Sequence, residues 1–220
     1  VLNGKQKQYR VSDQMADKIR EIVKKLDYKP NGFAKSLREG TNNTIGVIVS
    51  DIANPFFSNM VKSIENAAEE SGYMVLFASS DEKSEKLSSL LGKMLSKEVE
   101  GVIVVPCEGS EDTIRSLIDK RIPTVLLDRY IPEIRTNYVC LDNKKAGYDA
   151  TEALIRKNFK KIAMVCYDMK LSNTRDRIAG YMEAMENYGL KEESKVHYIN
   201  IETLEKSCVK AIDKTLADKT

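Results

Sequence analysis

The sequence is poor in the side chains from which metal sites and many catalytic sites are built. It contains one histidine, His197, no tryptophan, and four cysteines that lie far apart. Because no Cys-x-x-Cys pair occurs, we expect no metal site, and we expect the cysteines to be reduced packing residues of a cytoplasmic protein. These absences argue against a zinc-dependent enzyme and against a disulfide-stabilised exported protein.

Long hydrophobic runs are also missing. No segment approaches the ~18 consecutive apolar residues that a membrane-spanning helix needs. The first ten residues, VLNGKQKQYR, contain no apolar core of an export signal. A membrane protein and an exported protein are therefore not expected. The 220 residues are 42% hydrophobic and 31% charged, which suits one or two domains with buried cores.

Charge is distributed unevenly along the chain. Residues 1–44 contain ten Lys or Arg and five Asp or Glu, a charge of +5, whereas the whole chain carries +2. The remaining 176 residues therefore carry −3. A basic N-terminal segment on a slightly acidic body indicates that this segment meets a polyanion, although a solvated basic helix would show the same charge.

The basic segment contains one clear helix pattern. Ser12 is a suitable N-cap, Asp13 follows in the first turn, and apolar residues recur at helical spacing over residues 12–26. Pro30 then breaks the pattern. The next segment, Asn31–Glu39, has nine residues, fewer than the ~12–15 that an isolated helix needs in water. We therefore expect it not to be helical on its own, and a plain interdomain linker is the alternative interpretation.

From Thr44 onward, short strands alternate with amphipathic helices. The predicted strands are apolar throughout, as is typical of parallel strands that helices cover on both faces. They span residues 45–49, 74–78, 101–105, 124–127 and 138–141. This alternation predicts a doubly wound α/β domain with a parallel sheet.

A second α/β unit is predicted to begin near residue 159. It contains a strand at 162–166, a helix at 175–188, a strand at 196–201 and a helix at 203–217. Two strands and two helices cannot close a doubly wound sheet that is covered on both faces, so we expect this lobe to be incomplete. The expected divisions are a headpiece remnant at 1–30, a hinge and linker at 31–43, a first lobe at 44–158 and a partial second lobe at 159–220.

Several motifs follow one another in a recognisable order. The most diagnostic is TIGVIVSDIANPFFSNMVKSIENAAEESGY (44–73), which YRVSDQMADKIREIVKKLDYKPN (9–31) and AKSL (34–37) precede. EVEGVIVVP, IPTVLLDR, LDNKKAGYDATEALI and RDRIAGYMEAM come after it. This order resembles the lactose/galactose repressor (LacI/GalR) family of bacterial transcription regulators. The resemblance implies periplasmic-binding-protein-like lobes, preceded by the end of a helix-turn-helix headpiece and a hinge helix, with both ends of the usual chain absent.

The resemblance also implies a function. Such a protein is a sequence-specific DNA-binding regulator, most often a repressor, and acts on operator DNA as a homodimer. A small-molecule effector binds between its two lobes and changes their relative angle, which shifts the population of the DNA-competent hinge. The expected effector is a sugar or sugar phosphate first and a purine second.

DNA contacts follow from the same resemblance. Leu37 would be the wedge inserted between base steps in the minor groove. The other groove contacts would come from Asn31, Ala34 and Lys35. Contacts to phosphates, which position a protein without specifying sequence, would come from Asn3, Arg10, Ser12 and Tyr28. The chain departs from the family at Met15 and Ala16, where Thr and Arg are common, so one or two phosphate contacts are expected to be missing.

Effector contacts are expected at the carboxyl ends of the parallel strands, where open α/β sheets bind ligands. Phe56 and Phe57 follow the first strand and can cover the apolar face of a sugar or a base. At least one of them, and more readily Phe57, is expected to be a packing residue. Asp128 and Arg129 end the strand at 124–127, where a carboxylate beside a guanidinium can bind vicinal hydroxyls. A local ion pair is the alternative interpretation.

Further effector candidates come from the second lobe and from the first strand. The register of RDRIAGY matches Arg177 to the family's ligand-binding arginine, and Arg175 or Asp176 can share that role. Asp51 can reach the cleft from the end of the first strand. The pair Asp142–Asn143 precedes a helix, and we expect it to cap that helix rather than to bind ligand.

Two alternative functions make different demands on the sequence. A stand-alone periplasmic-type sugar-binding protein shares the sensor fold, but it needs an export signal and has no use for a basic segment with AKSL. A nucleotide-dependent enzyme needs a glycine-rich phosphate loop, whereas the turn after the first strand reads SDIANPFF. A Ser–His–Asp triad is not credible with one histidine in a strand-like run. We therefore expect no enzyme activity and no cofactor.

Overall fold

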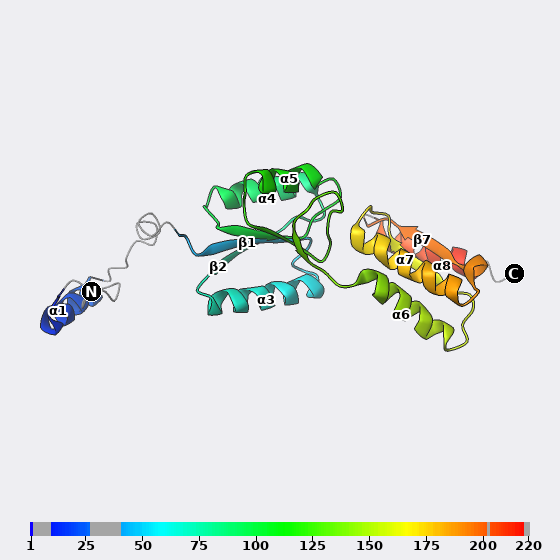
Figure 1. The fold of residues 1–220 in the computed structure, drawn as a ribbon, viewed down its shortest axis with the longest axis horizontal. Coiled ribbons are helices and arrows are strands. Elements are labelled where there is room, and N and C mark those ends of the chain that lie inside the picture. Colours follow the sequence, from blue (N-terminus) through cyan, green and yellow to red (C-terminus); the bar gives the residue numbers. More distant parts are fainter. Residues whose placement is uncertain (2–9, 27–40, 202, 218–220) are drawn as a thin grey trace. The chain divides into compact units, whose positions relative to one another are not determined.

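A computed structural model describes residues 1, 10–26, 41–201 and 203–217 of the chain. The chain divides into two compact units, residues 1–42 and 43–220. In the first unit, helix α1 (Asp13–Lys25) is labelled in Figure 1. The Ser12 hydroxyl oxygen accepts a hydrogen bond from the Met15 N–H, 3.3 Å away, which confirms the predicted N-cap.

The second unit opens with a five-stranded parallel sheet in the order β2-β1-β3-β4-β5. This is the first lobe, and it confirms the predicted doubly wound α/β architecture. Its elements are β1 (Thr44–Val49), α3 (Pro55–Glu70), β2 (Met74–Ser79), α4 (Ser84–Leu95), β3 (Gly101–Val104), α5 (Glu111–Asp119), β4 (Thr124–Leu127) and β5 (Asn137–Val139).

Helices cover both faces of this sheet, with α3 on one side and α4 and α5 on the other (Figure 1). Alternate residues of β1 serve the two faces: Ile48 packs in the cluster with α4 and α5, whereas Val47 and Val49 pack in the cluster with α3. All three side chains are fully buried. A central parallel strand is covered on both faces and must be apolar on both. This explains why the run IGVIV is apolar without alternation.

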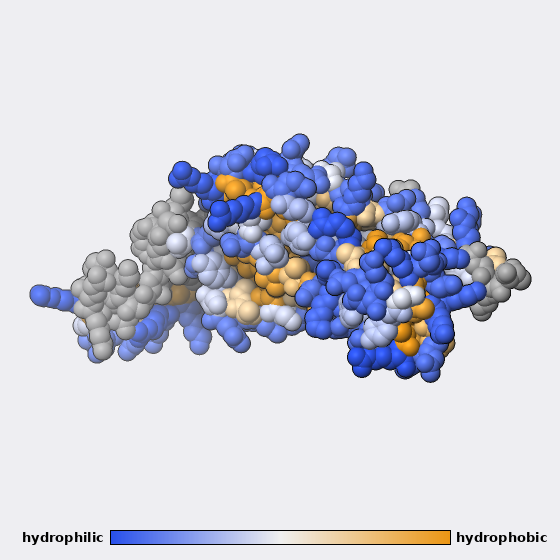
Figure 2. Space-filling view, turned by 45° about the vertical axis from the view of Figure 1, so that its right-hand side comes forward, coloured by the Kyte–Doolittle hydropathy of each residue, from blue (hydrophilic) through white to orange (hydrophobic). Residues whose placement is uncertain are grey.

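The edges of the sheet depart from the expectation that every strand is covered. Met74 and Phe77 on β2 and Tyr138 and Val139 on β5 are all more than half exposed. These strands lie at the two ends of the strand order, where fewer helices reach them. Apolar side chains therefore appear in patches on an otherwise hydrophilic surface (Figure 2).

The second lobe contains a two-stranded parallel sheet of β6 and β7. Its buried core is formed by Ile162, Tyr181 and Met185, against which Ile155 packs. Tyr181 is 2% exposed, and its hydroxyl donates to the Ile162 carbonyl at 2.7 Å and accepts from the Lys195 N–H at 2.7 Å. The elements are α6 (Asn143–Ile155), β6 (Ala163–Tyr167), α7 (Ser172–Asn187), the short 3-10 helix η1 (Lys191–Glu193), β7 (Lys195–Ile199) and α8 (Leu204–Ala217).

Helices α6 and α7 lie side by side and approach closely (Figure 1). A methyl group added to Gly147 would overlap the Arg177 carbonyl, and one added to Gly180 would overlap the Lys144 carbonyl. The two backbones therefore touch where both helices carry glycine. Because α6 packs on α7, we group α6 with the second lobe, which then starts near residue 142, whereas the sequence interpretation divides the lobes at 158/159.

The described residues contain no helix long and apolar enough to cross a membrane and no group of three or more potential metal ligands. All four cysteines are unpaired thiols, and Cys107 is buried. Burial raises the pKa of the Cys107 thiol above its ordinary value, although a hydrogen bond to Ser80 opposes this effect. A protonated, buried thiol is the chemistry of a packing residue.

Replacing Gly180 by alanine is expected to lower the free energy of unfolding by about 1–3 kcal/mol, because the added methyl group would push the two helices apart. Gly92→Ala in α4 is the matched control: it meets open space and is expected to stabilise the protein by about 0.5–1 kcal/mol through helix propensity. Denaturant unfolding measures both values. Equal stability of the two variants would contradict the α6–α7 contact.

Candidate functional site

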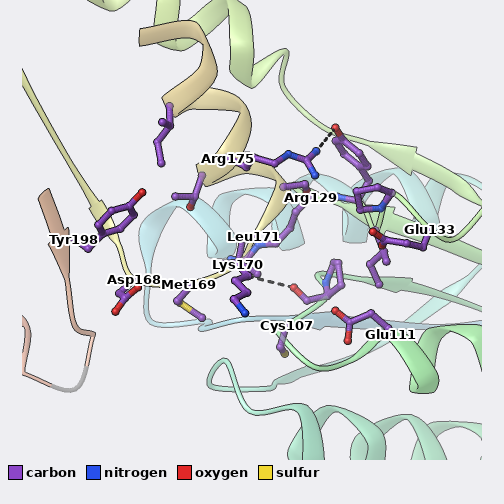
Figure 3. A pocket seen from close by; sticks show the side chains of 17 residues that line it. Cys107, Glu111, Arg129, Glu133, Asp168, Met169, Lys170, Leu171, Arg175 and Tyr198 are labelled. Carbon is purple, nitrogen blue, oxygen red and sulfur yellow. Dashed lines mark hydrogen bonds between the residues drawn. The ribbon is translucent and has the colours of Figure 1, made fainter. Parts of the chain in front are cut away.

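A cavity of about 650 Å³ lies between the two lobes. That volume is in the range of sites for small molecules. Its walls come from segments that follow strands β3, β4 and β6, from the starts of α5 and α7, and from β7 (Figure 3). The lining residues are Pro106, Cys107, Glu111, Arg129, Tyr130, Ile131, Pro132, Glu133, Asp168, Met169, Lys170, Leu171, Ser172, Thr174, Arg175, Ile178 and Tyr198.

Arg129 lies in the cavity wall just after β4 and is 5% exposed. Its two terminal nitrogens donate to the two carboxylate oxygens of Glu82 at 2.8 and 2.7 Å, and its Nε donates to Asp128 at 3.3 Å. The remaining N–H groups reach the Pro106 carbonyl at 3.2 Å and the Ser50 hydroxyl at 3.4 Å. A guanidinium has five N–H donors, so every donor of Arg129 already has an acceptor.

We call Glu82, Asp128 and Arg129 the Arg129 triad. Its three side chains are 15%, 6% and 7% exposed, respectively. Burial by itself lowers the pKa of Arg129, but the hydrogen bond and charge of Glu82, together with Asp128, raise that pKa overall. The guanidinium therefore stays charged, and the triad carries one positive and two negative charges.

Hydrogen bonds cross between the lobes beside the cavity. Asp128 accepts from the side-chain amide of Asn173 at 3.0 Å, and the backbone N–H of Tyr130 donates to the Ser172 hydroxyl at 2.9 Å. Asn173 and Ser172 open helix α7 and are buried. The end of β4 is therefore tied to the start of α7 by two buried polar contacts.

An aromatic and charged group forms another part of the wall. The Tyr130 hydroxyl donates to Asp176 at 2.9 Å. It also accepts from Arg175 at 2.9 Å, the bond drawn as a dashed line at Arg175 in Figure 3. Its ring stacks on Tyr138 with 5.0 Å between centroids. The hydrogen bond to Asp176 raises the pKa of Tyr130 above its ordinary value, so the phenol keeps its proton. Arg175 is itself paired with Asp176 at 3.0 Å.

The sequence-predicted residues near β4, Asp128 and Arg129, are brought together at the cavity. Asp128 and Arg129 do lie at the cavity, with Arg129 in its wall. Their side chains bond to each other and to Glu82, which is the local ion pair that was the alternative interpretation. The guanidinium therefore has no free N–H for vicinal hydroxyls.

The residues after β1 do not line this cavity. Phe57 is 6% exposed and packs from α3 against Val47 and Val49 of the sheet, as expected of a packing residue. Phe56 is 51% exposed and lines a separate shallow groove with Asn59, Met60 and Leu127. The cause is the start of α3, since the Asn54 side chain caps that helix by accepting from the Phe56 N–H.

Asp51 and Arg177 also lie outside the cavity lining. The carboxylate of Asp51 accepts from the Ala53 N–H at 2.8 Å and so shapes its own loop. Arg177 donates from Nε to the buried Asn143 side chain at 2.7 Å, on the side of α7 that faces α6. The predicted cap of α6 is confirmed, because Asp142 accepts from the Lys145 N–H at 2.9 Å.

Sequence reasoning missed three contributors to the site. Tyr130 directly follows the Asp–Arg pair at the end of β4, so the rule about strand ends could have found it. Lys170 lies in the loop after β6, where the same rule applies. Glu82 lies in the charged run DEKSEK (81–86), and no local pattern separates it from its solvated neighbours.

The predicted DNA contacts are mostly outside the described part of the chain. Arg10 and Ser12 are described; Arg10 is exposed at the start of the segment that leads into α1. The remaining predicted contacts lie outside the described residues, as does the hinge at 31–39: Asn3, Tyr28, Asn31, Ala34, Lys35 and Leu37.

Replacing Arg129 by alanine is expected to lower the free energy of unfolding by about 3–5 kcal/mol, because Glu82 and Asp128 would remain buried without their counter-charge. Arg115→Ala, at an exposed position of α5, is the matched control and is expected to change stability by less than about 0.5 kcal/mol. Denaturant unfolding compares the two. A similar, small effect in both variants would show that the triad does not stabilise the fold.

Comparison with known proteins agrees with this geometry. The chain is 29% identical over 204 residues to the HTH-type transcriptional regulator MalR of Streptococcus pneumoniae. The matched region covers 89% of this chain and 61% of MalR. The chain thus spans about three-fifths of the length of this relative. MalR is named as a transcription regulator and not as an enzyme.

Two solved structures are similar in fold. The Cra transcriptional dual regulator of Pseudomonas putida, in complex with fructose 1-phosphate, is 27% identical with a TM-score of 0.65, covering 71% of this chain and 57% of Cra. A periplasmic binding protein/LacI transcriptional regulator of Alkaliphilus metalliredigens QYMF, complexed with D-xylulofuranose, is 27% identical with a TM-score of 0.61, covering 72% of this chain and 56% of that protein.

A family model described as periplasmic binding proteins and sugar binding domain of LacI family matches residues 42–214. This range covers most of the chain, including both lobes and every residue of the cavity wall. The parallel sheets are those of this fold. The chain therefore belongs to the family of LacI-type regulator sugar-binding domains and periplasmic binding proteins.

Proposed function

We propose that the chain is the sensor part of a cytoplasmic, DNA-binding transcription regulator that acts as a repressor and binds a sugar between its two lobes. The observation that carries the proposal is the cavity of about 650 Å³ whose wall combines polar side chains of both lobes with apolar surface. Relatives crystallised with fructose 1-phosphate and with D-xylulofuranose support a sugar-sized ligand. The four unpaired thiols suit a reducing compartment.

The cavity suits a sugar ring chemically. Ile131, Leu171 and Ile178 present apolar surface on which the C–H face of a ring can pack. Tyr130 and Arg175 bring hydroxyl and guanidinium groups from opposite lobes. A ligand held by both would favour one relative angle of the lobes and so shift the population of DNA-competent dimers.

DNA binding is proposed for residues 1–43, the headpiece remnant and hinge. The supports are their charge, +5 over residues 1–44, and the capped helix α1, which follows Arg10. The proposed contacts remain those of the sequence interpretation, and operator DNA and a homodimer are the proposed partners. Arg10 and the hydroxyl of Ser12 stand at the positive end of α1, where a phosphate is favoured.

Arg175→Ala is expected to weaken sugar binding at least ~10-fold, a loss of about 1.4 kcal/mol, because the cavity loses its guanidinium from the second lobe. Arg156→Ala, which removes an exposed arginine paired with Glu152 at the end of α6, is the control and is expected to leave the dissociation constant unchanged. Titration calorimetry measures both. An unchanged constant in Arg175→Ala would remove this residue from the site.

Arg177 remains a proposed effector contact on the strength of the family resemblance. Its two terminal nitrogens make no hydrogen bond within the part of the chain that the structure describes, so they can still take a ligand hydroxyl. Arg177→Ala is expected to weaken binding in the same titration. Loss in Arg175→Ala but not in Arg177→Ala would assign the second-lobe contact to Arg175 alone.

The DNA affinity of the intact regulator is expected to fall at least ~10-fold between 50 and 200 mM salt, because phosphate contacts release counterions. Arg10→Ala is expected to reduce the slope of log affinity against log salt by about one. Lys93→Ala on α4 is the control that removes an exposed charge from the sensor. Fluorescence anisotropy measures the affinities, and salt-independent binding would contradict the proposal.

A further inference from the structure

The charge of the cavity wall is not balanced. The Arg129 triad contributes one guanidinium and two carboxylates, and all five donors of the guanidinium are engaged. In the other lobe, Arg175 is paired with Asp176. The two arginines therefore bring no uncompensated positive charge to a ligand.

The remaining charged side chains in the wall are mostly acidic (Figure 3). They are Glu111, Glu133 and Asp168, together with one lysine, Lys170. All four are exposed, and none has an ion pair within the described residues. Counting the wall with the partners of its arginines and with Arg177, the further proposed contact of the second lobe, four basic side chains stand against six acidic ones, a formal charge of −2.

We infer that the effector is an uncharged polyhydroxy compound of monosaccharide size, and that the cavity discriminates against its phosphorylated form. The inference rests on the proposed function and narrows it, since the sequence alone left sugar and sugar phosphate together. A phosphate has no donor hydrogens to offer when it is fully ionised and needs several N–H donors. A hydroxyl can donate to a carboxylate as well as accept from Arg175 or Lys170.

Electrostatics and desolvation act in the same direction. A phosphate carries a charge of about −1.5 to −2 at neutral pH, and entering the cavity would remove much of its hydration beside a wall of the same sign. Breaking the Arg129 triad to free its donors would leave two buried carboxylates without a partner, which is costly. The apolar surface of Ile131, Leu171 and Ile178 meanwhile suits the C–H groups of an uncharged ring.

The test uses the full chain and matched pairs of probes that differ by one phosphate. The pairs are D-ribose and ribose 5-phosphate, D-fructose and fructose 1-phosphate, D-glucose and glucose 6-phosphate, and adenosine and adenosine 5′-monophosphate. Titration calorimetry at low ionic strength gives the dissociation constant of each probe. The uncharged member of the bound pair is expected to bind at least ~10-fold more tightly than its phosphorylated partner.

Each outcome has a distinct consequence. Tighter binding of a phosphorylated sugar would overturn the inference and leave the sugar-sensor proposal intact. Binding of adenosine alone would support the inference on charge and contradict the proposal of a sugar. Binding of adenosine 5′-monophosphate alone would contradict both. Failure of every pair would contradict the proposed function, and the inference would fall with it.

A pair of double variants checks that the wall itself is responsible. Glu111→Gln with Glu133→Gln removes two carboxylates from the wall. This double variant is expected to reduce several-fold the ratio of the dissociation constants of the phosphorylated and uncharged probes. Glu69→Gln with Glu70→Gln makes the same change in net charge at exposed positions of α3 and is the control. Equal narrowing in both would show that net charge alone sets the preference, and no narrowing in either would overturn the inference.

Discussion

The guanidinium of Arg129 connects parts of the first lobe that are distant in sequence. Its acceptors follow β1 at Ser50, β2 at Glu82 and β3 at Pro106, while Arg129 itself follows β4. One side chain therefore ties together the carboxyl ends of four parallel strands. The segments after β3 and β4 form one side of the cavity, so the shape and the charge of that side depend on this cation.

The same network imposes a constraint. A buried guanidinium with two carboxylates is stable only when each donor and acceptor is satisfied, because an unpaired buried charge is costly. In this structure every N–H of Arg129 therefore has an acceptor within the protein, unlike those of an exposed arginine. The proposed ligand contacts Arg175 and Tyr130 keep some exposure and belong to opposite lobes.

Much of the fold could be predicted from the sequence. The run IGVIV predicts a central parallel strand, and β1 is buried on both faces. Ser12 predicts an N-cap because a hydroxyl before a helical pattern satisfies a free N–H, and the cap is present. Such features depend on neighbours within one turn or one strand, so local patterns contain the information.

Other features depend on contacts between distant segments. Glu82 binds Arg129, which is 47 positions away in the sequence. No local pattern near residue 82 predicts this ion pair. The placement of Phe56 depends on where α3 begins, and a shift of one residue would turn its ring to another face. The lobe to which α6 belongs follows from the match of two glycines on two helices, which is visible only when both are seen together.

The glycine contact between α6 and α7 also determines where the lobes can pivot. Since α6 moves with the second lobe, the described chain passes from one lobe to the other through residues 140–142, between β5 and the cap at Asp142. Within the described residues, a rotation of one lobe against the other therefore changes the backbone torsions of these few residues. Large torsion changes in a few residues between two packed units are the mark of a hinge, so we expect lobe closure to include a hinge at residues 140–142.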